Sequence, residues 1–150
     1  MKLEISLVPY GVITQTLAGL AERLVVASKL TAGRSNVDDL VRLFLIGQYS
    51  LWVIYDADAH GKLFGFFAVE IKAYPQRRML CVQHCVIDPH HLDKLRVRMD
   101  ELLEQYAKDN GCTGIEFVGR PGWKKYTKTH GYHSQSVTYQ RFFDLNQEQS

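Results

Sequence analysis

The cysteine and histidine residues that could bind a metal or act as nucleophiles gather in one short stretch of the sequence. They are Cys81, His84, Cys85, His90 and His91. A zinc site requires such side chains to converge on one point. On an extended strand Cys81 and Cys85 share a face but lie roughly 13 Å apart, at about 3.3 Å per residue, and His84 points to the other face. We therefore predict buried, free cysteine thiols and no metal site.

Two residues of this region are candidate proton acceptors. His84 lies within an apolar strand run, and histidine has an ordinary pKa that suits a general base near neutral pH. Glu70, on the preceding run, is the carboxylate alternative, since its neighbours Val69 and Ile71 point to the opposite side. The competing interpretations are structural. They are a core histidine satisfied by a backbone partner, and a solvated or sheet-edge glutamate.

A basic and aromatic region follows later in the chain. Between residues 117 and 143 the cations are Arg120, Lys124, Lys125, Lys128 and Arg141, with no aspartate or glutamate. Aromatic residues are interleaved with them, as in surfaces that bind nucleic acid, a phosphate-bearing ligand or an acidic protein. The structural alternatives to a binding surface are that the lysines interact with the dipole of a helix and that the aromatic residues belong to the core. We predict a partner-binding face formed by Arg120, Lys124, Lys125 and Lys128.

Composition limits the class of protein. The chain has 150 residues, of which 46% are hydrophobic and 23% charged, enough for one packed domain. Its net charge of +2 excludes a strongly polybasic nucleic-acid binder. No apolar run reaches the roughly 18 residues of a membrane span, and we expect no export signal. The three cysteines are an odd number and lack the spacing of a disulfide framework, which favours a reducing, cytoplasmic compartment.

Periodicity predicts the elements of the first half. Alternating apolar and polar residues predict a strand over residues 3–7, and helical spacing predicts one helix over residues 11–29. Asn36 caps a second helix that ends near residue 45. Three runs rich in strand formers, 50–56, 63–74 and 79–87, are joined by short turns and predict an antiparallel meander.

The second half adds a strand–helix–strand unit. The expected elements are a helix over 91–109, a strand over 113–118, a helix over 121–130 and a last strand over 137–145. Such a unit beside a meander indicates an α+β fold with a mixed, mostly antiparallel sheet. We expect a single domain over residues 1–145 and a polar tail over residues 146–150.

The order of these elements, βααβββαβαβ, resembles the GNAT (N-acetyltransferase) superfamily. The best local match contains Val86-Ile87-Asp88-Pro89 at a strand end, Asn110-Gly111-Cys112 after the long helix, and His130-Gly131-Tyr132. The resemblance implies the GNAT fold over nearly the whole chain. The phrase Gly119-Arg120-Pro121-Gly122-Trp123 is similar to small phage-encoded GNAT-like proteins, the group of internal virion protein A of short-tailed phages.

The resemblance also implies an acetyl-CoA site between two splayed strands. Cofactor contacts are expected at Val86 and Ile87 and in the segment that begins at His91. The family places a glycine-rich loop in that segment, whose backbone N–H groups bind the pyrophosphate. Lys94 and Arg96 stand where the family has glycines. They would meet a phosphate by charge, without the usual backbone cradle.

An acid–base pair is a further implication of the resemblance. His84, or alternatively Glu70, would remove the proton of the acceptor amine, and a tyrosine on the later helix would protonate the leaving thiolate. The tyrosine position falls on Thr127, and Tyr126 precedes it by one residue. One residue is about 100° on a helix, so Tyr126 would point elsewhere.

Three functions follow from these observations. The first is a bacteriophage GNAT-fold protein with a degenerate acetyl-CoA site, which binds a partner in virion assembly or host takeover. The second is an active acetyl-CoA-dependent N-acyltransferase with an atypical pyrophosphate loop. The third is a nucleic-acid-associated module that uses the basic region. The missing glycines and tyrosine favour the first over the second, and the near-neutral net charge favours it over the third. We expect weak or no binding of acetyl-CoA, and a location in the host cytoplasm or the virion.

Overall fold

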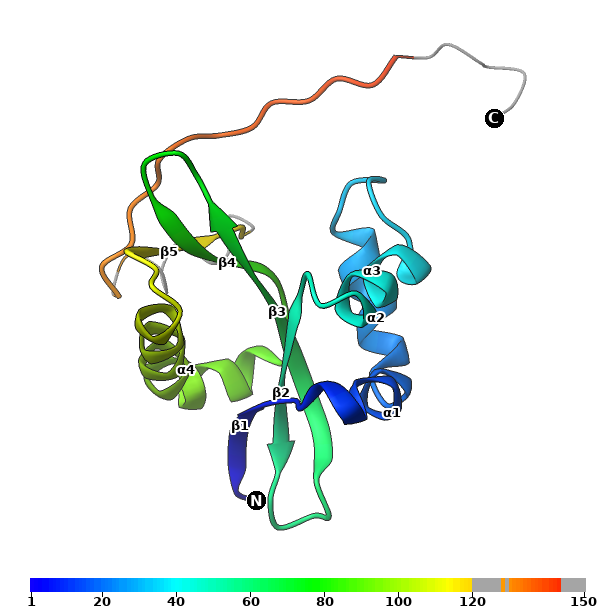
Figure 1. Cartoon of the computed structure of the whole chain (residues 1–150). Helices are drawn as coiled ribbons and strands as arrows, with labels where there is room; N and C mark the ends of the chain where they lie inside the picture. Colours follow the sequence, from blue (N-terminus) through cyan, green and yellow to red (C-terminus); the bar gives the residue numbers. More distant parts are fainter. Residues whose placement is uncertain (120–127, 129, 144–150) are drawn as a thin grey trace, which may run out of the picture.

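The computed structural model describes residues 1–119, 128 and 130–143. The elements are β1 (Leu3–Leu7), the 3-10 turn η1 (Tyr10–Val12), α1 (Ile13–Ala18), α2 (Ala21–Lys29), α3 (Val37–Leu45), β2 (Ser50–Asp56), β3 (Lys62–Ala73), β4 (Arg78–Ile87), α4 (Pro89–Asp109) and β5 (Gly114–Phe117). The strands form one sheet in chain order (Figure 1). Neighbouring strands are antiparallel except β4 and β5, which are parallel and joined by α4. The α+β prediction is confirmed.

Helices cover both faces of the sheet, α4 on one side and α1–α3 on the other (Figure 1). Alternate residues of β3 divide the core between these layers. Phe67 and Val69 pack on the α4 side, and Phe66 and Ala68 on the α1–α3 side. All four are buried. Because β3 is covered on both faces, its sequence is a continuous apolar run rather than an alternating one.

The single helix expected over residues 11–29 is broken, so that prediction was wrong. Gly19 and Leu20 separate α1 from α2, and their N–H groups each bond three residues back at 3.0 Å. This tighter turn places Leu20 fully inside the core. A Cβ at Gly19 would lie 3.1 Å from Cδ1 of Leu63, so glycine allows the turn to pack closely on β3.

The N-terminus of α3 confirms the predicted cap. Asn36 Oδ1 accepts a hydrogen bond from the N–H of Asp39 at 2.9 Å, and Asp39 Oδ2 accepts one from the N–H of Asn36 at 3.0 Å. This reciprocal pair is a capping box, which satisfies two helix-end donors that would otherwise lack acceptors.

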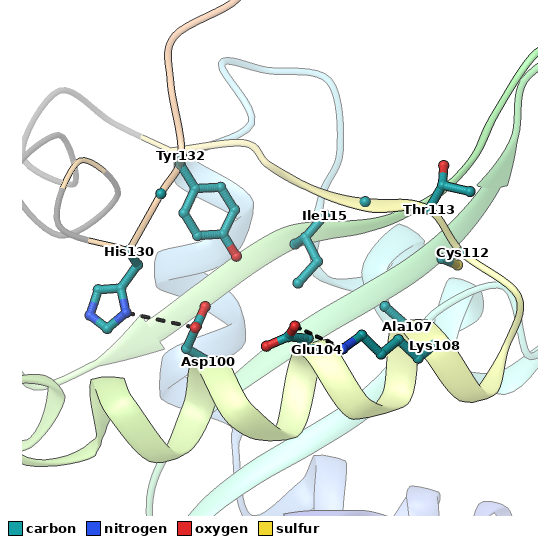
Figure 2. Close-up of a pocket in the computed structure, with 11 residues that line it drawn as sticks. Asp100, Glu104, Ala107, Lys108, Cys112, Thr113, Ile115, His130 and Tyr132 are labelled. Atoms are coloured by element: carbon teal, nitrogen blue, oxygen red, sulfur yellow. Dashed lines mark ion pairs between the residues drawn. The ribbon is translucent and has the colours of Figure 1, made fainter.

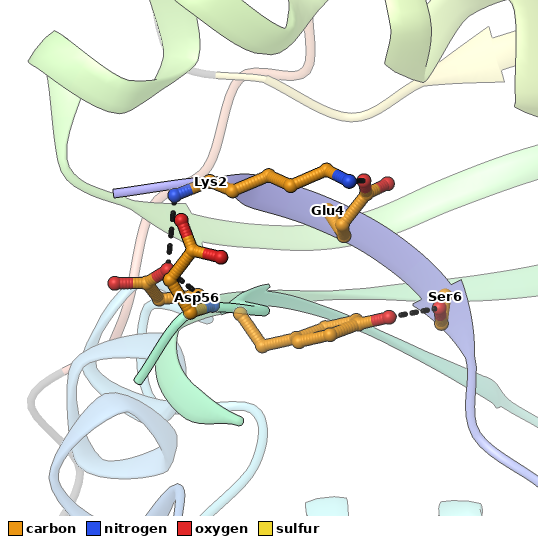
Figure 3. A network of polar contacts seen from close by, with 6 residues as sticks. Lys2, Glu4, Ser6 and Asp56 are labelled. Carbon is orange, nitrogen blue, oxygen red and sulfur yellow. Dashed lines mark hydrogen bonds and ion pairs between the residues drawn. The ribbon is translucent and has the colours of Figure 1, made fainter. Parts of the chain in front are cut away.

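A polar network joins β1 to β2 (Figure 3). Oδ1 of the buried Asp56 accepts hydrogen bonds from the N–H groups of Lys2 at 3.0 Å and Asp58 at 2.9 Å. These backbone donors hold the pKa of Asp56 below its ordinary value. Ser6 Oγ and the Tyr55 hydroxyl share a further hydrogen bond of 3.2 Å. The network fixes the register of the β1 edge strand.

The C-terminal region departs from the expected order. The strand expected over residues 137–145 is not formed over its described part, residues 137–143, where the chain is extended but unpaired with the sheet. That part of the prediction was wrong. The helix expected over residues 121–130 lies mostly outside the described residues, although Lys128 is helical. In the described part of the chain, none of the helices is long and apolar enough to cross a membrane.

Candidate functional site

A bulge in β4 determines which of its side chains face each helical layer. Val82 pairs with Val69 and His84 pairs with Ala68, so Gln83 is an extra residue opposite β3. An extra residue shifts the alternation of side chains by one position. Before Gln83 the odd-numbered residues of β4 face the α1–α3 side, and after Gln83 the even-numbered residues do.

The bulge corrects the expected arrangement of the cysteines. Cys81 pairs with Glu70 and faces the α1–α3 side, whereas Cys85 pairs with Phe67 and packs against the α4-side core. The prediction that these two cysteines share a face was therefore wrong. His84, expected on the face opposite Cys81, lies on the same face. Cys81, Cys85 and Cys112 are free, as predicted.

The bulge also lies where β4 and β5 part. Their pairing ends at Val82 and Phe117, and the N–H of Val118 donates the last hydrogen bond, to the Val82 carbonyl at 3.1 Å. From residue 84 to 87, β4 continues to pair with β3. Within the described residues, no strand pairs with its other side there. Two strands that diverge in this way leave backbone donors and acceptors between them without a strand partner.

Glu70 lies on the α1–α3 face, next to this divergence. Its carboxylate accepts hydrogen bonds from Gln48 Nε2 at 2.7 Å and Gln83 Nε2 at 3.1 Å, and Lys72 Nζ lies 3.8 Å away. The Glu70 side chain is 11% exposed. Two amide donors and one ammonium group thus surround the Glu70 carboxylate.

His84 is half-buried on the same face, with its ring edge-to-face against the ring of Tyr49 at 5.9 Å between centroids. Burial lowers the pKa of His84, so the imidazole is neutral at neutral pH and can accept a proton. The pKa of Tyr49 is raised, mainly by burial and further by Glu70 and Cys81, which keeps the phenol protonated. His84 and Tyr49 are thus a neutral imidazole and a neutral phenol in ring contact.

Cys81 completes this face as a thiol rather than a thiolate. The strand register places it between Glu70 and Glu116. Burial, with these two carboxylates, raises the pKa of Cys81 to about 11. Glu116 in turn accepts a hydrogen bond of 2.8 Å from the Tyr74 hydroxyl. The thiol is therefore poorly suited to act as a nucleophile near pH 7.

Sequence reasoning found His84 and Glu70 but missed their neighbours. Gln48 and Tyr49 precede β2, and Gln83 is the bulge residue. Polar residues at such positions carry no motif. Only the strand register shows that they meet at Glu70 and His84.

The N-terminus of α4 is capped by Asp88. Its Oδ1 accepts a hydrogen bond from the N–H of His90 at 2.9 Å, and its carbonyl oxygen accepts from the N–H groups of His91 and Leu92 at 3.0 Å each. The Leu92 bond is the first regular bond of the helix, whereas the N–H groups of His90 and His91 are first-turn donors that could otherwise bind an anion. A carboxylate and a carbonyl already occupy them. The residues here do not fit the pyrophosphate of acetyl-CoA.

The other expected cofactor contacts lie around this helix start. His91 is half-buried, with its ring edge-to-face on Phe64 at 4.9 Å. Lys94 is exposed on α4, and Arg96 forms an ion pair of 4.0 Å with Asp93. Val86 packs toward the α1–α3 core and Ile87 toward the α4-side core. The segment 91–96 is thus regular helix, and its backbone forms no anion-binding loop.

A cavity of about 320 Å³ lies between the C-terminal half of α4, β5 and residues 130–132 (Figure 2). The hydroxyl of Tyr132 donates a hydrogen bond to Asp100, and Nδ1 of His130 lies 3.8 Å from Asp100 Oδ2. Burial and Asp100 raise the pKa of Tyr132. Lys108 Nζ lies 3.0 Å from Glu104 Oε1. These contacts anchor residues 130–132 to α4. Of the sequence-predicted site residues that the structure describes, none lines the cavity.

The predicted basic face lies largely outside the described residues. Arg120, Lys124 and Lys125 are outside them, as is Tyr126, while Lys128 is described and exposed. Among the side chains that the structure describes, no cluster of three or more metal-binding groups occurs.

Comparison with known proteins identifies the fold. No protein-family model and no curated protein sequence matches the chain. Glucosamine-6-phosphate N-acetyltransferase of Arabidopsis thaliana aligns over 96% of this chain and 100% of its own, with 19% identity and a TM-score of 0.66. A ribosomal-protein-alanine N-acetyltransferase of Brucella melitensis aligns over 94% and 99%, with 15% identity and a TM-score of 0.67. A predicted acetyltransferase of Clostridium acetobutylicum, solved with acetyl-CoA, aligns over 99% and 98%, with 12% identity and a TM-score of 0.65.

These similarities, together with the mixed five-stranded sheet, show that the chain has the GNAT acetyltransferase fold.

Proposed function

We propose that this GNAT-fold protein has a degenerate acetyl-CoA site and acts mainly by binding a partner. The setting suggested by the sequence resemblance is a bacteriophage protein in virion assembly or host takeover. The fold of an acetyltransferase does not by itself supply the activity, because function resides in the site.

The observation that carries the proposal is the Asp88 cap of α4. A helix start binds phosphate through free N–H groups and the positive end of its dipole. Here the N–H of His90 donates to the Asp88 carboxylate at 2.9 Å. A pyrophosphate in this position would have to displace the cap and approach its negative charge. The nearby cations, Lys94 and Arg96, lie on regular helix and supply charge without a backbone cradle.

The partner that we propose is an acidic protein surface or a phosphate-bearing ligand. The support is the sequence between residues 117 and 143, which contains cations and no acidic residue. Of these cations, Lys128 and Arg141 are described, and both are exposed. Such a surface has a positive field that extends about 8 Å at physiological salt.

Titration calorimetry of the full chain with acetyl-CoA, and separately with CoA, tests the proposal. We expect dissociation constants weaker than about 100 µM for both. The same titration of the Asp88→Asn variant tests the cap, because this variant keeps a capping side chain without its charge. The Asp38→Asn variant is the control, because it removes the same charge at the exposed start of α3. A dissociation constant in the low micromolar range for the unaltered chain would contradict a degenerate site, since it corresponds to about −8 kcal/mol.

A second candidate function, N-acyl transfer, is favoured by one observation. The neutral His84 imidazole lies on the sheet face next to the divergence of β4 and β5. There it is suited to take the proton of an acceptor amine. Release of CoA thiol from acetyl-CoA in the presence of peptide and amino-sugar acceptors, abolished by His84→Gln, would establish this candidate instead.

A further inference from the structure

The outer side of α2 carries a cluster of exposed apolar side chains. Val25 is 41% exposed, Val26 47%, and Leu30, the residue that ends the helix, 43%. Among the described side chains of α4, a helix more than twice as long, Val97 is the one large apolar group that is exposed. Apolar side chains that gather on one exposed surface mark interaction sites, whereas single exposed ones are ordinary.

Helix geometry places Val25 and Val26 together on the side of α2 that faces away from the core. The buried residues Leu24 and Ala27 define the inner side of the helix. At about 100° per residue, Val25 and Val26 lie on either side of the direction opposite to these two residues. The two valines therefore form the centre of an outward-facing patch.

Two opposite charges flank the valines at equal distances. Glu22 lies three residues before Val25, and Lys29 lies three residues after Val26. Seven residues are close to two helical turns, so both charged side chains lie on the outward side of α2. Both residues are exposed. Within the described part of the chain, neither of them forms an ion pair.

An open apolar groove lies beside this patch. Its volume is about 260 Å³, and it separates α1 and α2 from α3, on the side of the sheet away from α4 (Figure 1). Ala21 and Leu24 line it from α2, and Val37, Val41 and Leu45 line it from α3. Ala21 is exposed, and its short side chain leaves room for a larger apolar group at the edge of the groove.

The patch is complementary to itself. When a two-fold axis passes between Val25 and Val26, two α2 helices lie antiparallel, and Val25 of one copy faces Val26 of the other. The same rotation places Glu22 of each copy opposite Lys29 of the other. A parallel pair of helices would place like charges opposite each other, which is unfavourable. The charges therefore favour the antiparallel arrangement.

The groove fits the same arrangement. Leu30 lies four residues after Val26, and Ala21 lies four residues before Val25. The two-fold axis therefore brings Leu30 of one copy to the level of Ala21 of the other, at the edge of the groove. A leucine that is exposed in the single chain thus meets an apolar site in the second copy.

We infer that the outer side of α2 is a homodimer interface, in which two copies pack their α2 helices antiparallel and each inserts Leu30 into the groove of the other. The same patch serves both copies, so the interaction closes at the dimer and forms no filament. Burial of the valines and leucines supplies the affinity, and the two ion pairs fix the register. Because α4 lies on the other side of the sheet, this inference does not depend on the proposed function.

Sedimentation equilibrium of the full chain, between about 1 and about 100 µM, brackets micromolar dissociation constants and tests the dimer. Val26→Glu places an unpaired charge against Val25 of the second copy, and should raise the dissociation constant about 100-fold or more. Val97→Glu is the control, because it makes the same change at the exposed valine of α4 and should leave the dimer intact. Thermal melting of both variants checks that the domain remains folded.

A charge swap tests the antiparallel pairing. Glu22→Lys replaces two attractive contacts by two repulsive ones and should weaken the dimer about 10-fold. Addition of Lys29→Glu restores opposite charges and should return the dissociation constant to within about threefold of the original value. Glu22 lies in the first turn of α2 and Lys29 in the last, so the swap opposes the helix dipole. A role in helix stability alone therefore predicts a double variant that melts lower and recovers no association.

Three results would overturn the inference. The first is a chain that stays monomeric to about 100 µM, which would leave the groove to a different occupant. The second is a dimer that Val26→Glu leaves intact. The third is a dimer that Glu22→Lys does not weaken, or that the double variant does not restore.

Discussion

The carboxylate of Asp88 lies 2.9 Å from the backbone nitrogen of His90, at the start of the long helix α4. In this position the side chain satisfies a helix donor and adds a negative charge to the positive end of the helix dipole. Under the proposed function, the same contact stabilises the helix and occupies the place of the cofactor's phosphate, and so links stability to ligand binding.

Replacement of Asp88 tests its stabilising role. Asp88→Ala removes the cap and should lower the free energy of unfolding by about 1 kcal/mol. Asp88→Asn keeps an oxygen acceptor and should change it by no more than a few tenths of a kcal/mol. Urea denaturation measures both. Equal stability of the two variants would show that the hydrogen bond to His90 does not matter.

His84 should make stability depend on pH. Burial lowers its pKa in the folded protein below the ordinary value of 6.5, so the unfolded chain binds a proton more readily. The contribution of the neutral His84 side chain to the free energy of unfolding is fully present above pH 6.5. It is lost as the pH falls from 6.5 through the lowered pKa of the folded state.

The measurement is urea denaturation at pH about 7.5 and about 5. The loss of stability between the two should be smaller in His84→Gln than in the unaltered chain. His133→Gln, at an exposed histidine, is the control and should retain the full loss. A His84→Gln variant with an unchanged pH dependence would contradict the prediction.

The two cysteines of β4 should react slowly in the native protein. Burial raises the pKa of Cys81 to about 11 and that of Cys85 to about 12, so the thiolate fraction is small at pH 8. Ellman's reagent should therefore modify both slowly in the folded state. After denaturation without a reductant, all three cysteines should react. Recovery of a single thiol would reveal a disulfide.

Gly65 should be intolerant of a side chain. A Cβ there would lie 2.6 Å from the carbonyl oxygen of Val86, which is backbone of the paired strand and cannot move freely. Gly65→Ala should lower the free energy of unfolding by about 1–3 kcal/mol. Gly114→Ala is the matched control, because its Cβ would meet the flexible end of Met79 at 2.8 Å. A cost for Gly114→Ala as large as that for Gly65→Ala would contradict this reasoning.

The basic face can be tested by charge reversal. Lys128 is exposed, and Lys124, four residues earlier, is predicted to share its helix face. Changing both to Glu should alter the free energy of unfolding by within about 0.5 kcal/mol and should weaken binding of polyglutamate, with a flatter salt dependence. Stronger binding of duplex DNA than of polyglutamate by the unaltered chain would favour the nucleic-acid alternative. Binding unaffected by the reversal would exclude this face.

The sequence alone determined most of the elements and the fold class. Helical spacing and a strong cap defined α3, and the glycine after residue 110 defined the end of α4. Three runs of strand formers with short turns predicted β2, β3 and β4. These features depend on side chains within a few residues of one another, which a linear pattern records directly.

The tertiary structure alone decided how the elements are used. The Gln83 bulge placed His84 with Cys81 and Glu70 and moved Cys85 to the opposite face. At the break, Gly19 has little room for a side chain because Leu63, which is distant in the sequence, lies close to it. Residues 137–143 have strand-forming side chains yet remain outside the sheet of their own molecule. Strand register, close approach and strand partners are set by contacts between distant residues, and no local periodicity encodes those contacts.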